Sequence, residues 1–223
     1  MLADQILYED NHLIAINKLA GQIVQGDKTG DVPLVDLLKE FIKERDHKPG
    51  NVFCGTIHRL DRPVSGVVVF AKTSKALSRM NELVKGRDFH KTYHAVVKDM
   101  PPQMQGHLED YLVRNEKLNK SFVTRNGSQP GAKLASLDYH LLATSSGGYH
   151  LLEIELHTGR HHQIRCQLAH MGCPIKGDLK YGAPRSNPDA SISLHSYKLT
   201  FEHPVKHESV TIIAPDPWSG MFE

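Results

Sequence analysis

The chain has 223 residues, three cysteines and a formal net charge of +2, so it is long enough to bury a core without disulfides, and its few cysteines suit a reducing compartment. Its N-terminus lacks the basic and apolar regions of a signal peptide, and no apolar run reaches membrane-spanning length. These properties exclude a disulfide-stapled secreted protein, and they predict a soluble cytoplasmic protein of one domain, or of one domain with two lobes.

The first ninety residues predict a hairpin, a helix, a strand and a second helix. Apolar runs at 6–8 and 12–17 flank a polar turn, which is typical of a hairpin. Apolar residues recur at helical spacing from Pro33 to residue 42. The run 67–71 predicts a buried strand, and the next helix is expected to have Ser74 as its N-cap and to close at Gly86.

The second half predicts mainly strands. One covers 91–97 and is followed by a connection containing Pro, Gln and Gly, and then by a basic, irregular stretch at 114–133 that is expected to be a mobile insertion. Segments 135–144 and 149–156 predict a hairpin, 161–171 a short helix, and segments near 192–201 and 208–214 the last strands. Together these elements predict an α+β fold with a mixed, largely antiparallel sheet and flanking helices.

The motif His-Arg-Leu-Asp-Arg-Pro-Val-Ser-Gly at 58–66 comes just before a buried strand. Its single carboxylate, Asp61, stands between Arg59 and Arg62, and neighbouring cations favour the ionised form of an acid. Such an aspartate can act as a nucleophile or base toward an anionic substrate that the arginines attract. From the motif alone, a catalytic carboxylate and a surface ion-pair cluster are equally supported interpretations. Residues 56–98 carry nine Lys and Arg against three acids, which indicates an anionic partner, nucleic acid first.

Several familiar kinds of site find no support. The chain has no phosphate-binding P-loop, dinucleotide fingerprint or serine-hydrolase elbow. His162, Cys166, His170 and Cys173 would share one helix stripe, a composition typical of zinc. Positions i and i+8 of a helix lie roughly 12 Å apart, however, and zinc ligands must converge within about 2.0–2.3 Å of the ion. No metal is therefore predicted, and a metal-dependent RNA hydrolase stays as an alternative.

A second basic block, 156–168, joins the end of a strand to the start of a helix and contains Arg165. Helix N-termini and arginines both favour anions. A buried guanidinium without a partner is costly, so Arg165 either pairs with a carboxylate, for which Asp61 is the candidate, or lies exposed on the polar face.

Separated blocks of the chain, in order, resemble the RluA-type pseudouridine synthases, which isomerise uridine within RNA. Residues 6–21 resemble the opening strands of that family, 58–66 its catalytic motif, 91–97 the segment with the tyrosine that lies over the target base, and 157–182 the block containing a catalytic arginine. The resemblance spans nearly the whole chain. It implies a pseudouridine synthase catalytic fold with a central active-site cleft, as a single domain over 1–223 without an N-terminal S4 RNA-binding domain.

The resemblance also implies a role for each matched residue. Asp61 would be the catalytic carboxylate, which either attacks or stabilises the ribose C1′ or adds to the base. Tyr93 would stack on the uracil and is a candidate to help remove the C5 proton. Arg165 would hold Asp61 oriented and ionised. Arg59 would occupy the space vacated when the target uridine leaves its stack. The implied substrate-binding residues are His58, Arg59, Leu60, Arg62, Arg160, His162 and Lys176.

The implied reaction breaks the N1 glycosidic bond of uridine, rotates the freed uracil and reattaches it through C5, with no metal or other cofactor. The implied partner is a stem-loop of rRNA or tRNA, bound by a monomer. A non-catalytic RNA-binding module of the same fold is the alternative. The chain departs from the usual family pattern at Leu19, Val64, His161 and Ser196, where proline, threonine, threonine and alanine are usual. None of these is a predicted catalytic position.

Overall fold

The computed structural model describes residues 2–223, and Met1 lies outside the described residues. The chain divides into two compact units. Unit 1 comprises Met1–His90 and Ser196–Pro215, and unit 2 comprises Lys91–His195 and Asp216–Glu223. In residues 2–223 strands predominate and three α-helices accompany them, so the predicted α+β class is confirmed. No helix in the described part of the chain is long and apolar enough to cross a membrane.

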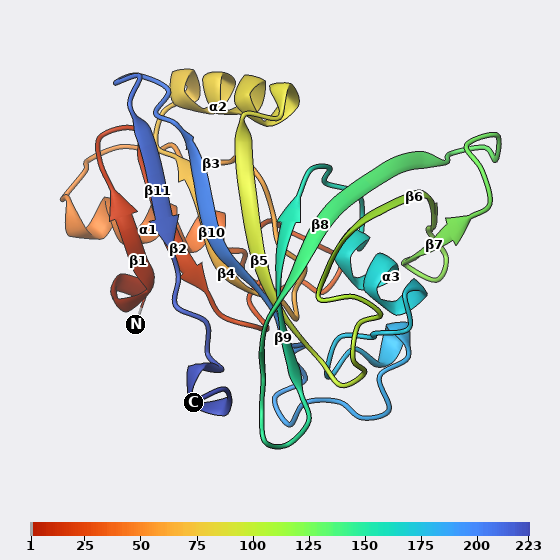
Figure 1. The fold of residues 1–223 in the computed structure, drawn as a ribbon. Coiled ribbons are helices and arrows are strands. Elements are labelled where there is room, and N and C mark those ends of the chain that lie inside the picture. Colours follow the sequence, from red (N-terminus) through yellow and green to blue (C-terminus); the bar gives the residue numbers. More distant parts are fainter. Residues whose placement is uncertain (1) are drawn as a thin grey trace. The chain divides into compact units, whose positions relative to one another are not determined.

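Unit 1 is built around a β-sheet (Figure 1). A short helical turn, Leu2–Gln5, leads into the hairpin of β1 (Ile6–Glu9) and β2 (Leu13–Lys18), and β2 pairs antiparallel with β4 (Ser65–Ala71). The remaining strands are β3 (Gly55–Thr56), which pairs with β4, and β10 (Leu194–Glu202), which pairs with β11 (Ser209–Ile213). The helices are α1 (Leu34–Arg45) and α2 (Ser74–Gly86). The hairpin, both helices and the strand at 67–71 are therefore confirmed.

The core of unit 1 lies between α2 and the sheet. Met80 of α2 packs with Val67 and Val69 of β4 and with Phe201 of β10 in one apolar cluster. The alternate residues of β4 are fully buried as well, so the strand is covered on both of its faces. A strand covered in this way reads as a continuous apolar run, which is why the sequence at 67–71 predicted it.

The start of α2 differs from the prediction by one residue. Thr73, not Ser74, is the N-cap, since its backbone is extended and its side-chain oxygen accepts a hydrogen bond from the backbone N of Ala76 at 3.1 Å. Two adjacent hydroxyl residues offered the same capping signal, and only the backbone conformation distinguishes them.

Unit 2 contains the strands β5 (Phe89–Val97, of which the first two residues belong to unit 1), β9 (His150–Leu156), β8 (Lys133–Thr144), β6 (Gln105–Asn115) and β7 (Lys120–Thr124), in that spatial order and all antiparallel. In Figure 1 the long strands β6 and β8 curve beside α3 (Gln163–His170). Cys166 of α3 packs against Leu112 and Ala135. Two short helical turns, Leu179–Tyr181 and Ser219–Met221, complete the elements.

The prediction of an irregular, mobile insertion at 114–133 is wrong for part of that stretch. Strand β6 extends to Asn115, β7 covers 120–124 and pairs with β6 from Tyr111↔Thr124 to Asn115↔Lys120, and β8 begins at Lys133. The connection expected after residue 97 likewise contains most of β6. Every second residue of β6 faces solvent, and several of these residues are charged, so the strand contains no continuous apolar run.

Candidate active site

Asp61 lies on the loop between β3 and β4 in unit 1 and is half-buried. Its backbone carbonyl accepts a hydrogen bond from the N of Val64 at 3.0 Å, which closes a tight turn. At the start of the loop, the buried His58 accepts a hydrogen bond at Nε2 from the backbone N of Val69 at 3.0 Å. The loop that carries Asp61 is thus closed on itself by a turn and bound to β4 through His58.

Lys18, the last residue of β2, is fully buried and binds the backbone of the same loop. Its ammonium donates to the backbone carbonyls of Asp61 at 3.2 Å, Arg62 at 3.1 Å and Val64 at 2.5 Å. Burial lowers the pKa of Lys18 to about 7, although the nearby charge of Asp61 acts in the opposite direction. The sequence prediction missed Lys18, and its signal was a lysine at the end of an apolar strand.

Gly66 permits a close approach of backbones at the start of β4. Its φ is +114°, and a Cβ atom there would lie within 2.7 Å of the backbone of Ser196. Only glycine fits this combination of conformation and space. Ser196, one of the departures from the family pattern, is therefore packed directly behind the end of the Asp61 loop.

The arginines of the motif have different environments. Arg62 donates to Asp31 at 2.6 Å, to Thr29 at 2.6 Å and to Asp27 at 3.2 Å. It therefore secures the motif to the loop around residues 27–31, and its charge is shared with two acids that the sequence analysis did not connect to it. Arg59 is exposed, whereas Leu60 is buried. Their predicted contacts with RNA stay predictions.

Arg165 in unit 2 forms a buried ion pair with Asp178. Its Nε and Nη2 donate to the two carboxylate oxygens at 2.7 and 2.8 Å, and the two side chains are 7% and 1% exposed. The alternative of an exposed Arg165 is wrong. Asp178 was missed, although it is the single acid between 157 and 185. The pairing of Arg165 with Asp61, which belongs to unit 1, stays a prediction.

Tyr181 and His162 support this ion pair from the same unit. The Arg165 guanidinium lies 5.1 Å from the centroid of the Tyr181 ring. The Tyr181 hydroxyl accepts from the backbone N of Ser121 at 2.8 Å and lies 3.0 Å from Nδ1 of His162. Burial, with the charge of Arg165 next, lowers the pKa of His162 to about 2, so the imidazole that contacts the hydroxyl is neutral. Burial also raises the pKa of Tyr181 to about 12.

Of the other predicted residues of unit 2, Tyr93 lies on a strand, whereas Arg160 and Lys176 lie in the connections before and after α3. Tyr93 is 7% exposed in the middle of β5, opposite Ile154 of β9. Arg160 donates from Nε to the carbonyl of Leu134 at 2.8 Å, and Lys176 donates to Asn187 at 2.7 Å. Their roles toward substrate stay predictions.

The His and Cys stripe does not assemble. Across residues 2–223, no three donor atoms of His162, Cys166, His170 and Cys173 come within 4.8 Å of one another. Burial raises the pKa of the Cys166 thiol to about 11, and its Sγ donates to the carbonyl of Ser121 at 3.3 Å. Cys166 is thus a packing residue.

Comparison with known proteins gives consistent matches. The family model described as RNA pseudouridylate synthase matches residues 12–170. A tRNA pseudouridine synthase C of Vibrio vulnificus is 32% identical over 98% of this chain and 94% of its own length, and that of Yersinia pestis is 30% identical over 98% and 89%.

The same resemblance extends to solved structures. The human RNA pseudouridylate synthase domain containing 4 superposes with a TM-score of 0.79 at 26% identity, over 97% of this chain and 90% of the human chain. The human domain containing 1 superposes with a TM-score of 0.73 at 23% identity, over 96% and 84% of the two chains, and this second likeness concerns the fold alone.

Proposed function

The chain belongs to the RNA pseudouridylate synthase family, and on that premise we propose that Asp61 is the catalytic carboxylate with which it isomerises uridine in RNA to pseudouridine. The reaction breaks the bond between N1 and C1′ and forms one between C5 and C1′. The proton on C5 is lost and N1 gains one, so no co-reactant is consumed. A glycoside hydrolase uses a second carboxylate to activate water, whereas this isomerisation must keep water out, so a single acid suffices.

The rigidity of the Asp61 loop carries this proposal. Catalysis requires the reacting group to be held to within a fraction of an ångström, since small misplacements are expensive. Lys18 donates to the backbone carbonyls of Asp61, Arg62 and Val64, and Gly66 packs against the backbone of Ser196. A carboxylate on an ordinary surface loop does not require a buried ammonium bound to the backbone of that loop.

Arg165 is proposed as the residue that orients Asp61. A guanidinium carries five N–H donors, and the bond to Asp178 uses two of them while fixing the plane of the group. A guanidinium fixed in this way is a pre-organised partner for a second carboxylate. Arg165 would then keep Asp61 ionised without a reorganisation cost at each turnover.

Tyr93 is proposed to stack on the uracil, with Arg59 in the space that the flipped nucleotide leaves. Flipping costs a few kcal/mol and costs least where the base is already unpaired. We therefore place the target uridine in a loop or stem-loop. Contacts of RNA with His58, Leu60, Arg62, Arg160, His162 and Lys176 belong to the same proposal.

The proposed substrate is tRNA, because the similar enzymes from Vibrio and Yersinia carry that substrate in their names. Action as a cytoplasmic monomer completes the proposal. The discriminating assay offers tRNA and rRNA transcripts containing 5-tritiated uridine and measures tritium release. Release from tRNA alone is expected, and release only from rRNA would refute the assignment.

The role of Asp61 is tested with Asp61→Asn and the matched control Asp36→Asn, an exposed aspartate on α1 that pairs with Lys39. Asp61→Asn should abolish tritium release while RNA affinity, from filter binding, stays within a few-fold. Asp36→Asn should behave as wild type. Wild-type turnover in Asp61→Asn would remove this carboxylate from the reaction.

Tyr93 calls for a separate pair of variants. Tyr93→Phe keeps the ring and loses the hydroxyl, and Tyr149→Phe makes the same change at the tip of the β8–β9 hairpin. A fall in turnover restricted to Tyr93→Phe would assign proton transfer to the hydroxyl. An unchanged rate would leave only the stacking role.

A further inference from the structure

Unit 2 carries a cluster of metal-ligating side chains apart from the predicted catalytic residues. Nδ1 of His107 lies 2.6 Å from one carboxylate oxygen of Asp138, and Nε2 of His157 lies 2.6 Å from the other. The three donor atoms all lie within 4.8 Å of one another. The two imidazole centroids are 6.2 Å apart, on either side of the carboxylate.

The sheet fixes the backbone under this cluster. His107 of β6 and Asp138 of β8 are direct partners across the antiparallel ladder, so their side chains project from the same face. His157 follows β9, and its backbone N donates to the carbonyl of Ser136 at 3.2 Å. Strands β6 and β8 and the bend that follows β9 thus bring the three side chains together.

The cluster lies on the face of the sheet opposite Tyr93. The row that contains Asp138 continues through Glu155 to Thr92, whereas Tyr93 belongs to the next row, with Ile154 and Tyr139. Successive residues of a strand point to opposite faces. A metal bound here would therefore be separated from Tyr93 by the thickness of the sheet.

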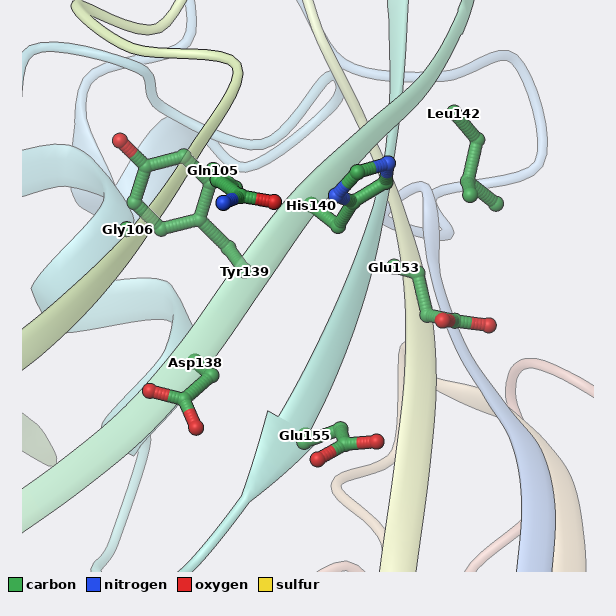
Figure 2. A pocket seen from close by; sticks show the side chains of 8 residues that line it. All are labelled: Gln105, Gly106, Asp138, Tyr139, His140, Leu142, Glu153 and Glu155. Atoms are coloured by element: carbon green, nitrogen blue, oxygen red, sulfur yellow. The ribbon is translucent and has the colours of Figure 1, made fainter.

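Carboxylates accumulate around this point. Asp138, Glu153 and Glu155 line one open hollow of about 720 Å³, and Figure 2 shows them projecting from β8 and β9. Oε2 of Glu109 lies 3.8 Å from Nε2 of His107, the ring nitrogen turned away from Asp138. At this distance Glu109 forms no hydrogen bond with His107, but it adds a negative charge beside the imidazole, which favours a bound cation.

We propose that His107, Asp138 and His157 form a binding site for a transition-metal dication such as Zn²⁺, with the fourth position open to solvent. Two imidazoles and one carboxylate are a donor set that zinc favours. Tetrahedral ligands at about 2.0–2.2 Å from zinc stand roughly 3.3–3.6 Å from one another. Donor atoms already within 4.8 Å reach that spacing by small side-chain rotations. Both histidines are half-exposed, so an ion enters directly from water.

The test is a calorimetric titration of untagged, metal-stripped full-length protein with Zn²⁺, and a parallel titration with Co²⁺ followed by absorption. One equivalent should bind, and Co²⁺ should give visible bands without a thiolate charge-transfer band. Asp138→Asn and His157→Gln should each weaken binding by more than about tenfold, since even changes outside the coordination shell cost about 10–100-fold.

The matched control is His207→Gln. His207 makes a similar exposed contact with a carboxylate, 2.8 Å from Glu202, but no second imidazole joins it. This variant should bind Zn²⁺ as wild type does. Binding that survives Asp138→Asn, a thiolate band with Co²⁺, or affinity no greater in wild type than in His157→Gln would each overturn the proposal. Unchanged melting temperatures of the metal-free variants exclude misfolding as the cause of a loss.

Discussion

Replacing Lys18 by methionine tests whether a buried ammonium holds the Asp61 loop. The fall of its pKa from 10.5 to about 7 corresponds to about 5 kcal/mol by which burial disfavours the charged form in the folded protein. Below about pH 7 the lysine is charged in both folded and unfolded chains, and the folded state bears this cost in full. Between about pH 7 and pH 10.5 the unfolded chain holds the extra proton, so stability rises with pH.

Methionine has no such titration. The free energy of unfolding of wild type, minus that of Lys18→Met, should therefore increase by about 2 kcal/mol between about pH 7 and pH 9. The carbonyl of Val64 loses its bond from Nζ in the variant, at a cost of about 1–3 kcal/mol. That cost shifts the difference at every pH and leaves its slope unchanged.

The assay is urea unfolding of both proteins at the two pH values, followed by circular dichroism. Lys39→Met is the control, because Lys39 lies on the surface and pairs with Asp36. Its difference from wild type should stay within about 0.5 kcal/mol at both pH values. A wild-type minus Lys18→Met difference that is equally flat would refute the buried, shifted lysine.

Two further substitutions test the residues that support the candidate site. Gly66→Ala should lower the free energy of unfolding by about 2–5 kcal/mol, because an alanine there has a strained positive φ and collides with the backbone of Ser196. The control Gly26→Ala adds a Cβ atom that meets nothing within 4 Å, so it should change the free energy of unfolding by less than about 1 kcal/mol. Equal urea midpoints of the two variants would contradict this packing. Asp178→Asn should cost about 3–5 kcal/mol and reduce tritium release, because Arg165 would be left buried with a neutral partner; a stability loss below about 1 kcal/mol would show that the ion pair is dispensable.

Periodicity was sufficient for unit 1 because its strands and helices carry strong apolar patterns. The β2 and β4 strands are buried on both faces, and the inner side of α2 is formed by Met80 and its neighbours. The position of the α2 cap could not be resolved, since Thr73 and Ser74 are chemically alike.

The hairpin of β6 and β7 was mispredicted for a physical reason. Its residues alternate between solvent and a small core, so the apolar positions are sparse and the charged ones prominent. Pairing with β8 and packing against α3 stabilise it, and neither contact is local in sequence.

Asp61, Tyr93 and Arg165 came from sequence blocks, but their supporting residues did not. Lys18 acts through backbone carbonyls 43 to 46 residues away, and Asp178 meets Arg165 across 13 residues. Partners of this kind leave no local pattern. A buried charge must be paired, so a lone acid in a basic block is the clue that sequence reasoning could have used for Asp178.

The hydrogen bonds of Lys18 go to main-chain atoms, which affects how the sequence of this loop can change in evolution. Carbonyl oxygens are common to all residues, so mutation of the side chains at positions 62 and 64 leaves the attachment points of Nζ in place. Val64 is 2% exposed and contributes its N–H and C=O to the turn, so the hydroxyl usual in its relatives has no required partner here. Side chains of this loop can thus change while the backbone that carries Asp61 keeps its position.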